Sequence, residues 1–97
     1  MTDYTYEYCR WLHNNANDPV ELWSELDGDR WEIRKIERWA DGRLGHASAS
    51  EEVGDARLAE LPLPSIEEIA ADPEFQPRPS SKEEFESWWN ASMQANG

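Results

Sequence analysis

The hydrophobic pattern of this chain changes its period near the middle, and this change limits the fold more than any other feature. Polar and apolar side chains alternate over residues 4–12, 20–26, 31–39 and 43–49, as expected for strands. Residues 65–70 and 81–95 instead place apolar side chains three or four positions apart, which predicts helices. We therefore expect an α+β fold: an antiparallel meander of three or four strands, with a short helix and a C-terminal helix packed on one face.

Turn and capping signals indicate where these elements begin and end. Asp41-Gly42 is a strong hairpin signal, and the Asp-Gly-Asp sequence at 27–29 predicts a second turn. Two pairs of residues have the spacing of a helix capping box: Ser65 with Glu68, and Ser81 with Glu84. In the third strand, Ile33 and Ile36 fall on opposite faces, which indicates either a bulge or a sheet covered on both faces.

The length of 97 residues predicts one domain, residues 1–97, with one modest core. We expect the sheet over about 3–49, an acidic connector with the short helix over about 50–75, and the C-terminal helix over about 81–95. Residues 76–80 are predicted to form a proline-containing spacer. No internal repeat divides the chain.

Large aromatic residues take the place of aliphatic ones in the expected core. Only 15 of the 97 residues are Leu, Ile, Val or Phe, but the chain has six Trp and three Tyr. Each large aromatic side chain buries roughly 150–250 Å². Phe85, Trp88 and Trp89 have helical spacing, so they are expected to dock the last helix onto the sheet.

Two tryptophans are candidates for contact with a partner protein. Trp23 alternates with Leu22, so it lies on the strand face opposite the expected apolar face, and we expect it to be partly exposed. Trp39 ends the third strand. Because Trp is a common anchor of protein interfaces, Trp23 and Trp39 are predicted partner-binding residues.

The net charge disfavours several classes of partner. The chain has 21 acidic and 9 basic residues, for a net charge of −12, and residues 48–97 hold 11 acidic and only 3 basic side chains. Direct binding to nucleic acid or to anionic membranes is disfavoured, whereas a cationic protein is a natural complement. Residues 60–75 are stiffened by three prolines, and they carry five candidate partner-binding carboxylates: Glu60, Glu67, Glu68, Asp72 and Glu74.

That same segment also has a purely architectural interpretation. Pro62 and Pro64 can stiffen a crossing from sheet to helix, while Leu61 and Leu63 contact the core. In this reading the carboxylates only solubilise the surface. Both interpretations remain open at the level of the sequence.

Residues suited to catalysis or metal binding are scarce. His13 and His46 are the only imidazoles, Cys9 is the only cysteine, and no paired-cysteine or His-rich motif is present. We therefore expect no enzymatic activity, no cofactor and no metal. A single cysteine, no apolar membrane-length run and no signal-peptide pattern favour a cytoplasmic protein, which we expect to be a monomer or weak dimer.

A series of short motifs runs along nearly the whole chain: WLH (11–13), PV (19–20), SELD (24–27), RKIE (34–37), DGR (41–43) and ELPLPSIEEIAADPEF (60–75). The series resembles a bacterial family of short acidic proteins known only as a domain of unknown function. Small acidic proteins of this kind resemble immunity proteins, which are encoded beside polymorphic toxins. The resemblance brings no catalytic residues with it.

The resemblance and the charge together give the leading hypothesis, an immunity protein that occludes the active site of a cationic toxin domain, for which we expect nuclease activity. Nucleases hold Lys and Arg where phosphates bind, and carboxylates can occupy those positions. Two alternatives are a nucleic-acid mimic that inhibits a defence or DNA-binding protein, and an adaptor module unrelated to toxins.

Overall fold

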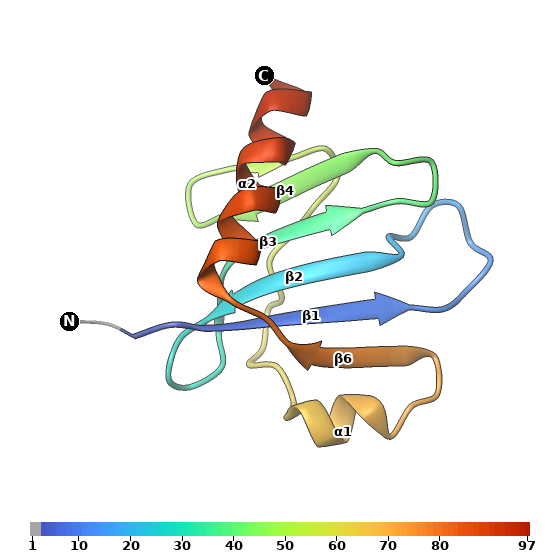
Figure 1. Ribbon diagram of the computed structural model, residues 1–97, viewed down its shortest axis with the longest axis vertical. Helices are drawn as coiled ribbons and strands as arrows, with labels where there is room; N and C mark the ends of the chain where they lie inside the picture. The colour runs from blue at the N-terminus through green and yellow to red at the C-terminus, as the bar shows by residue number, and fades with distance from the viewer. Residues whose placement is uncertain (1–2) are drawn as a thin grey trace.

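The structure, a computed structural model, describes residues 3–97 and has the expected α+β architecture (Figure 1). One antiparallel sheet of six strands has the order β5-β4-β3-β2-β1-β6. The strands and helices are β1 (Thr5–Trp11), β2 (Glu21–Leu26), β3 (Glu32–Arg38), β4 (Leu44–Ser48), β5 (Glu52–Val53), α1 (Ile66–Ala70), β6 (Phe75–Pro79) and α2 (Lys82–Asn96). Neither helix is long and apolar enough to cross a membrane, within the described residues.

A bulge between β2 and β3 explains the irregular pattern of the third strand. Glu25 pairs with Arg34, but the next residue, Leu26, pairs with Glu32, which leaves Ile33 as the extra residue. One additional residue in a strand reverses the face of everything that follows it. The register therefore accounts for the opposite phases of Ile33 and Ile36 along the strand.

Strand β6 was not expected, because its sequence contains two prolines and was interpreted as a spacer. It pairs with β1 at the sheet edge, where the N–H of Ser80 donates to the carbonyl of Tyr6 at 2.8 Å. In β6, backbone groups point toward β1 and away from it at alternate residues. Ser80 points toward β1, so Pro79 and Pro77 have their nitrogens on the side away from β1. Proline costs no ladder hydrogen bond in that position, which is why an edge strand accepts it.

Helix α2 lies across one face of the sheet and encloses an aromatic core (Figure 1). Phe85 and Trp89 of α2 pack with Trp23 and Ile36 of the sheet, and Trp88 stacks on Trp23 with ring centroids 4.5 Å apart. The predicted docking of this helix is confirmed. The expectation that Trp23 is partly exposed is wrong: it is 1% exposed because α2 covers its face of the sheet.

The opposite face of the sheet is crossed by the connector, which we define as residues 54–65. It runs from β5 behind the sheet to α1, which lies beside β6 (Figure 1). Ala56 of the connector is fully buried. The predicted capping box at Ser65 and Glu68 is present and begins α1.

The start of α2 departs from the predicted capping box. Ser81 Oγ accepts from the backbone N–H of Glu84 at 3.1 Å, but the carboxylate of Glu84 turns to Arg78 and Ser80. Hydrogen bonds from Arg78 lower the pKa of Glu84 to about 2. Glu84 thereby ties β6 to α2 in addition to starting the helix.

Candidate protein-binding surface

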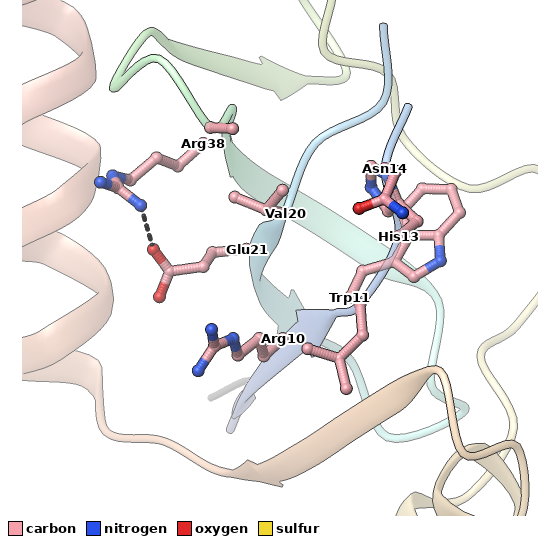
Figure 2. Close-up of a pocket in the computed structure, with 9 residues that line it drawn as sticks. Arg10, Trp11, His13, Asn14, Val20, Glu21 and Arg38 are labelled. Atoms are coloured by element: carbon pink, nitrogen blue, oxygen red, sulfur yellow. Dashed lines mark hydrogen bonds and ion pairs between the residues drawn. The ribbon is translucent and has the colours of Figure 1, made fainter. Parts of the chain in front are cut away.

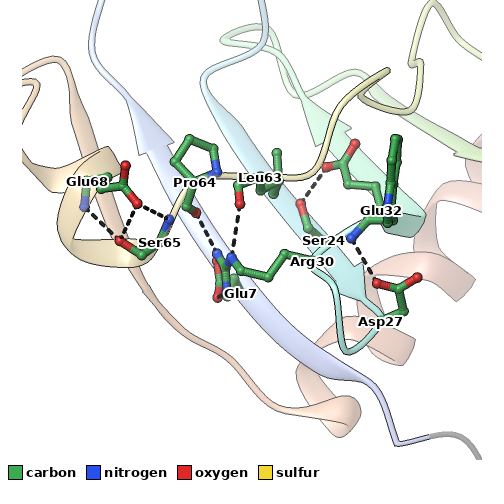
Figure 3. Close-up of polar contacts among 10 residues, drawn as sticks. Glu7, Ser24, Asp27, Arg30, Glu32, Leu63, Pro64, Ser65 and Glu68 are labelled. Carbon is green, nitrogen blue, oxygen red and sulfur yellow. Dashed lines mark hydrogen bonds and ion pairs between the residues drawn. The ribbon is translucent and has the colours of Figure 1, made fainter.

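Arg30 joins the connector to the sheet (Figure 3). Its guanidinium forms a bidentate ion pair with Glu7 of β1, at N–O distances of 2.8 and 2.9 Å. The same group donates to the carbonyls of Leu63 at 3.1 Å and Pro64 at 2.7 Å. The carbonyl of Arg30 also accepts from the N–H of Leu63 at 2.8 Å. One residue therefore sets where the connector lies on the sheet just before α1 begins.

Glu32 of β3 holds the middle of the connector. Its Oε1 accepts from the backbone N–H of Ala59 at 2.6 Å and lies 3.0 Å from Nζ of Lys35, while its Oε2 accepts from Ser24 Oγ at 2.8 Å. Glu37 lies 3.9 Å from the same Nζ, and burial raises the pKa of Glu37 to about 6. The charges beneath the connector are thus largely paired with one another.

The five predicted carboxylates are all exposed in the structure. Glu60 lies on the connector, Glu67 and Glu68 in the first turn of α1, Asp72 just after α1, and Glu74 just before β6. None of them forms an ion pair within residues 3–97. We call the surface formed by the connector, α1 and the turn into β6 the connector face.

Most of the positive charge in the chain is already paired with carboxylates elsewhere. Six basic residues form ion pairs with acidic side chains: Arg30, Arg34, Lys35, Arg38, Arg43 and Arg78. The five predicted carboxylates on the connector face have no such partner within residues 3–97, although Arg57 of the connector is also exposed. The negative potential of the connector face is available to attract a cationic surface.

A hollow of about 410 Å³ opens on the connector face between α1, the connector and the sheet. We call it the connector pocket. Six residues form its apolar walls: Cys9, Leu22, Leu63, Pro64, Ile69 and Phe75. The carboxylate residues Glu68 and Asp72 also line it, and the paired Glu32 and Lys35 lie at its polar end. Apolar walls with a few polar groups are typical of binding pockets.

Two large apolar side chains near the connector remain exposed. Leu61 is 73% exposed and Trp31 is 42% exposed. Each lies within two residues of the backbone hydrogen bond between Leu63 and Arg30, which brings their chain segments together. The exposed tryptophan on this side of the molecule is thus Trp31, and not the predicted Trp23.

A second hollow, of about 520 Å³, lies at the loop between β1 and β2 (Figure 2). Arg38 there is paired with Glu21 at 2.6 Å. His13 accepts at Nδ1 from the backbone N–H of Asn15 at 3.0 Å, so its Nε2 donates to the carbonyl of Pro19 at 2.8 Å. Both ring nitrogens hold the loop together, and neither is free to move a proton.

The other groups that could support chemistry are also engaged or isolated. His46 is 3% exposed, with Nδ1 bonded to Ser92 and Nε2 3.4 Å from Glu51. Cys9 is partly buried, and burial raises the pKa of its thiol. Among residues 3–97, no group of three His, Cys, Asp or Glu side chains is arranged to hold a metal ion.

A family model described as a domain of unknown function, DUF6881, matches residues 5–94. The chain belongs to the DUF6881 family. The matched region takes in all six strands, the connector, α1 and all but the end of α2. No curated protein and no solved structure matches the chain.

In this DUF6881 protein, the structure brings only some of the predicted partner-binding residues together. Glu68 and Asp72 share the connector pocket, with Glu67 next to them on α1, whereas Glu60 and Glu74 lie outside it. Of the two predicted tryptophans, neither joins this surface.

Trp39 is unsuited to be an anchor for a partner. It is 3% exposed, its Nε1 donates to the carbonyl of Asn17 at 3.2 Å, and the Arg43 guanidinium lies 4.7 Å from its ring centroid. This burial, in which the β1–β2 loop folds over the end of β3, counts against the predicted role of Trp39. Sequence reasoning also missed Arg30, whose role depends on contacts with residues 23 and 33 positions away.

Proposed function

We propose that this protein is an acidic inhibitor of the immunity type, which binds a cationic toxin domain inside the cell that produces both. The observation that carries the proposal is the connector face. It combines exposed, unpaired carboxylates with an apolar pocket and the exposed Leu61, within a chain whose basic residues are mostly paired. Such a surface matches a partner that is basic and partly apolar.

Inhibition would follow from occupation of the toxin's own substrate site. An enzyme that acts on nucleic acid holds Lys and Arg where phosphates bind, so carboxylates placed there displace the substrate. The Arg30 and Glu32 contacts keep the connector in one position, which reduces the entropy lost on binding. Long-range attraction between the opposite charges would also speed association.

The nucleic-acid mimic is less well supported. A mimic needs carboxylates at phosphate-like intervals along an extended face. This molecule measures 35 × 30 × 24 Å, and two of its five candidate carboxylates line an apolar pocket. Phosphate mimicry makes no use of an apolar pocket, whereas an apolar side chain of a partner can anchor in one.

The test is co-expression with the product of the neighbouring gene, alone and with this protein. We expect the neighbour to arrest growth, this protein to restore it, and the two to elute as one complex in size-exclusion chromatography. A nuclease assay with purified components then measures inhibition. A neighbour that arrests growth but is neither bound nor relieved by this protein would refute the proposal.

A further inference from the structure

The two faces of the sheet are covered unequally. On the α2 side, Trp23 and Ile36 are 1% and 0% exposed. On the connector side, Leu22 of the same strand as Trp23 is only partly buried, and so are Cys9 and Phe75. The connector and α1 leave part of this face open, and the connector pocket is what remains.

The pocket has the size and the walls to hold an apolar group. Its volume of about 410 Å³ lies within the roughly 300–1,000 Å³ that is usual for ligand pockets. Inserting an apolar group would remove the exposed parts of Leu22, Leu63 and Ile69 from water. The polar end does not oppose this, because Lys35 and Glu32 already neutralise each other at 3.0 Å.

The rim of the pocket favours a positive charge beside that apolar group. Glu68 accepts from the hydroxyl of Ser65 at 3.0 Å, and Asp72 accepts from the backbone N–H of Glu74 at 2.9 Å. These donors are neutral, so neither contact supplies a counter-charge to the carboxylates. A Lys or Arg that reaches the rim would pair with them.

We infer that the connector pocket receives a large apolar side chain of the cationic partner, with a Lys or Arg beside it paired to Glu68 and Asp72. The inference rests on the proposed function and describes its partner in chemical terms. A second copy of this chain is a poor occupant. A two-fold contact through the pocket would bring each acidic rim against its own counterpart.

Cys9 makes the pocket accessible to measurement, because it lines the pocket and is the only cysteine in the chain. Its alkylation by iodoacetamide is followed at alkaline pH with three capped peptides: Lys-Phe-Lys, Lys-Ser-Lys and Glu-Phe-Glu. We expect Lys-Phe-Lys to slow alkylation several-fold and the other two to have little effect. The inference would be overturned if all three peptides slowed alkylation equally, or if Lys-Phe-Lys did not slow it at millimolar concentration. It would also be overturned if the alkylation rate fell as the concentration of the protein itself was raised, because a second copy would then cover the pocket.

Variants separate the rim from a general charge effect. Glu68→Gln with Asp72→Asn removes two charges but keeps an oxygen to accept from Ser65 and from the Glu74 N–H, so the fold should stand. This double variant should lose protection by Lys-Phe-Lys. The control removes the same charge elsewhere, through Glu52→Gln with Glu83→Gln, and should keep it. Both residues of the control are exposed and lie outside the pocket.

The toxin complex from the co-expression test distinguishes failure of the inference from failure of the proposed function. Protection of Cys9 in that complex supports both. If the complex forms and growth is restored but the alkylation rate of Cys9 is unchanged, the pocket inference is refuted while the proposed inhibitor function stands. If the product of the neighbouring gene does not bind but Lys-Phe-Lys still protects Cys9, the pocket inference stands and the proposed inhibition of a toxin is refuted.

Discussion

His46 of β4 and Ser92 of α2 form a buried hydrogen bond between Nδ1 and Oγ at 2.7 Å. The two residues are 3% and 0% exposed. The His46 ring also packs edge-on against Trp89, with centroids 4.8 Å apart. A directional polar contact inside an otherwise aromatic interface therefore aligns the last helix on the sheet.

Ser92→Ala should weaken the fold, because it leaves a buried nitrogen of His46 without a partner. We expect the free energy of unfolding to fall by about 1–3 kcal/mol, the usual cost of an unsatisfied buried polar group. Urea denaturation measures the loss. Ser87→Ala on the exposed side of the same helix is the control, and equal stability of the two variants would contradict this role.

Trp89→Ala should remove a large part of the stability of the protein. Truncating a buried Trp costs about 3–5 kcal/mol, and a small domain has about 5–15 kcal/mol in total. Trp88 is only partly buried, although it stacks on Trp23, so Trp88→Ala should cost less. Thermal melts followed by near-ultraviolet circular dichroism compare the two. If both variants melt within a couple of degrees of the parent, the packing of α2 described above is incorrect.

Arg30→Ala should release the connector from the sheet. Arg30 has φ of +67°, and alanine is as disfavoured there as arginine, so the variant reports chiefly on the guanidinium. We expect a loss of about 1.5–3 kcal/mol, as for hydrogen bonds to charged groups. Amide exchange should accelerate at Leu63 more than in β3. Arg57→Ala removes one positive charge from the connector at an exposed site and should leave exchange unchanged.

Glu37→Gln should stabilise the protein above pH 6. Burial raises the pKa of Glu37 from 4.5 to about 6, so the folded state binds its proton more tightly than the unfolded state does. Stability from this group is therefore present below pH 4.5 and is lost as the pH rises to about 6. Relative to the parent, the variant should gain about 1–2 kcal/mol across this window. Urea titrations at pH 4.5 and 7 test this, and a pH-independent difference would contradict it.

The triple variant Glu67→Gln, Glu68→Gln, Asp72→Asn should slow association with the partner and flatten its salt dependence. Attraction between the charged surfaces weakens as the screening length falls from about 10 Å at 0.1 M salt to about 3 Å at 1 M. Stopped-flow kinetics at two salt concentrations measure both quantities. The matched triple, Asp3→Asn with Glu52→Gln and Glu83→Gln, removes as much charge from other exposed sites. If the two triples behave alike, the connector face has no special role.

Local signals predicted the parts of the fold that local physics decides. The alternation of β1 to β4, the Asp41-Gly42 turn and the capping box at Ser65 were sufficient for the strands, a hairpin and α1. Trp23 was correctly placed on the face opposite Leu22, but its expected exposure was wrong because α2 covers that face, and alternation alone cannot say which face of a sheet a helix will cover. Strand β6 was missed because its prolines are tolerated only at the edge it occupies.

For the candidate site, the sequence predicted the negative charge but not the pocket. Residues 60–75 stood out as acidic and rigid, but the pocket depends on how far α1 stands from Leu22, which is set by contacts distant in sequence. The exposure of Trp31 likewise depends on the turn at Asp27, whose carboxylate accepts from the Trp31 N–H at 3.0 Å. Neither feature has a signal in a single sequence.

The prolines of β6 also bear on how crowded solutions of this protein behave. Fibrils grow when a bare strand edge offers a row of N–H groups to another chain. Pro77 and Pro79 leave no N–H at the outward positions, and the N–H of Phe75 is taken by the carbonyl of Asp72 at 3.0 Å. The opposite edge, β5, is only two residues long. Neither edge strand therefore offers a long row of free N–H groups, so we expect concentrated solutions of the protein to resist fibril growth.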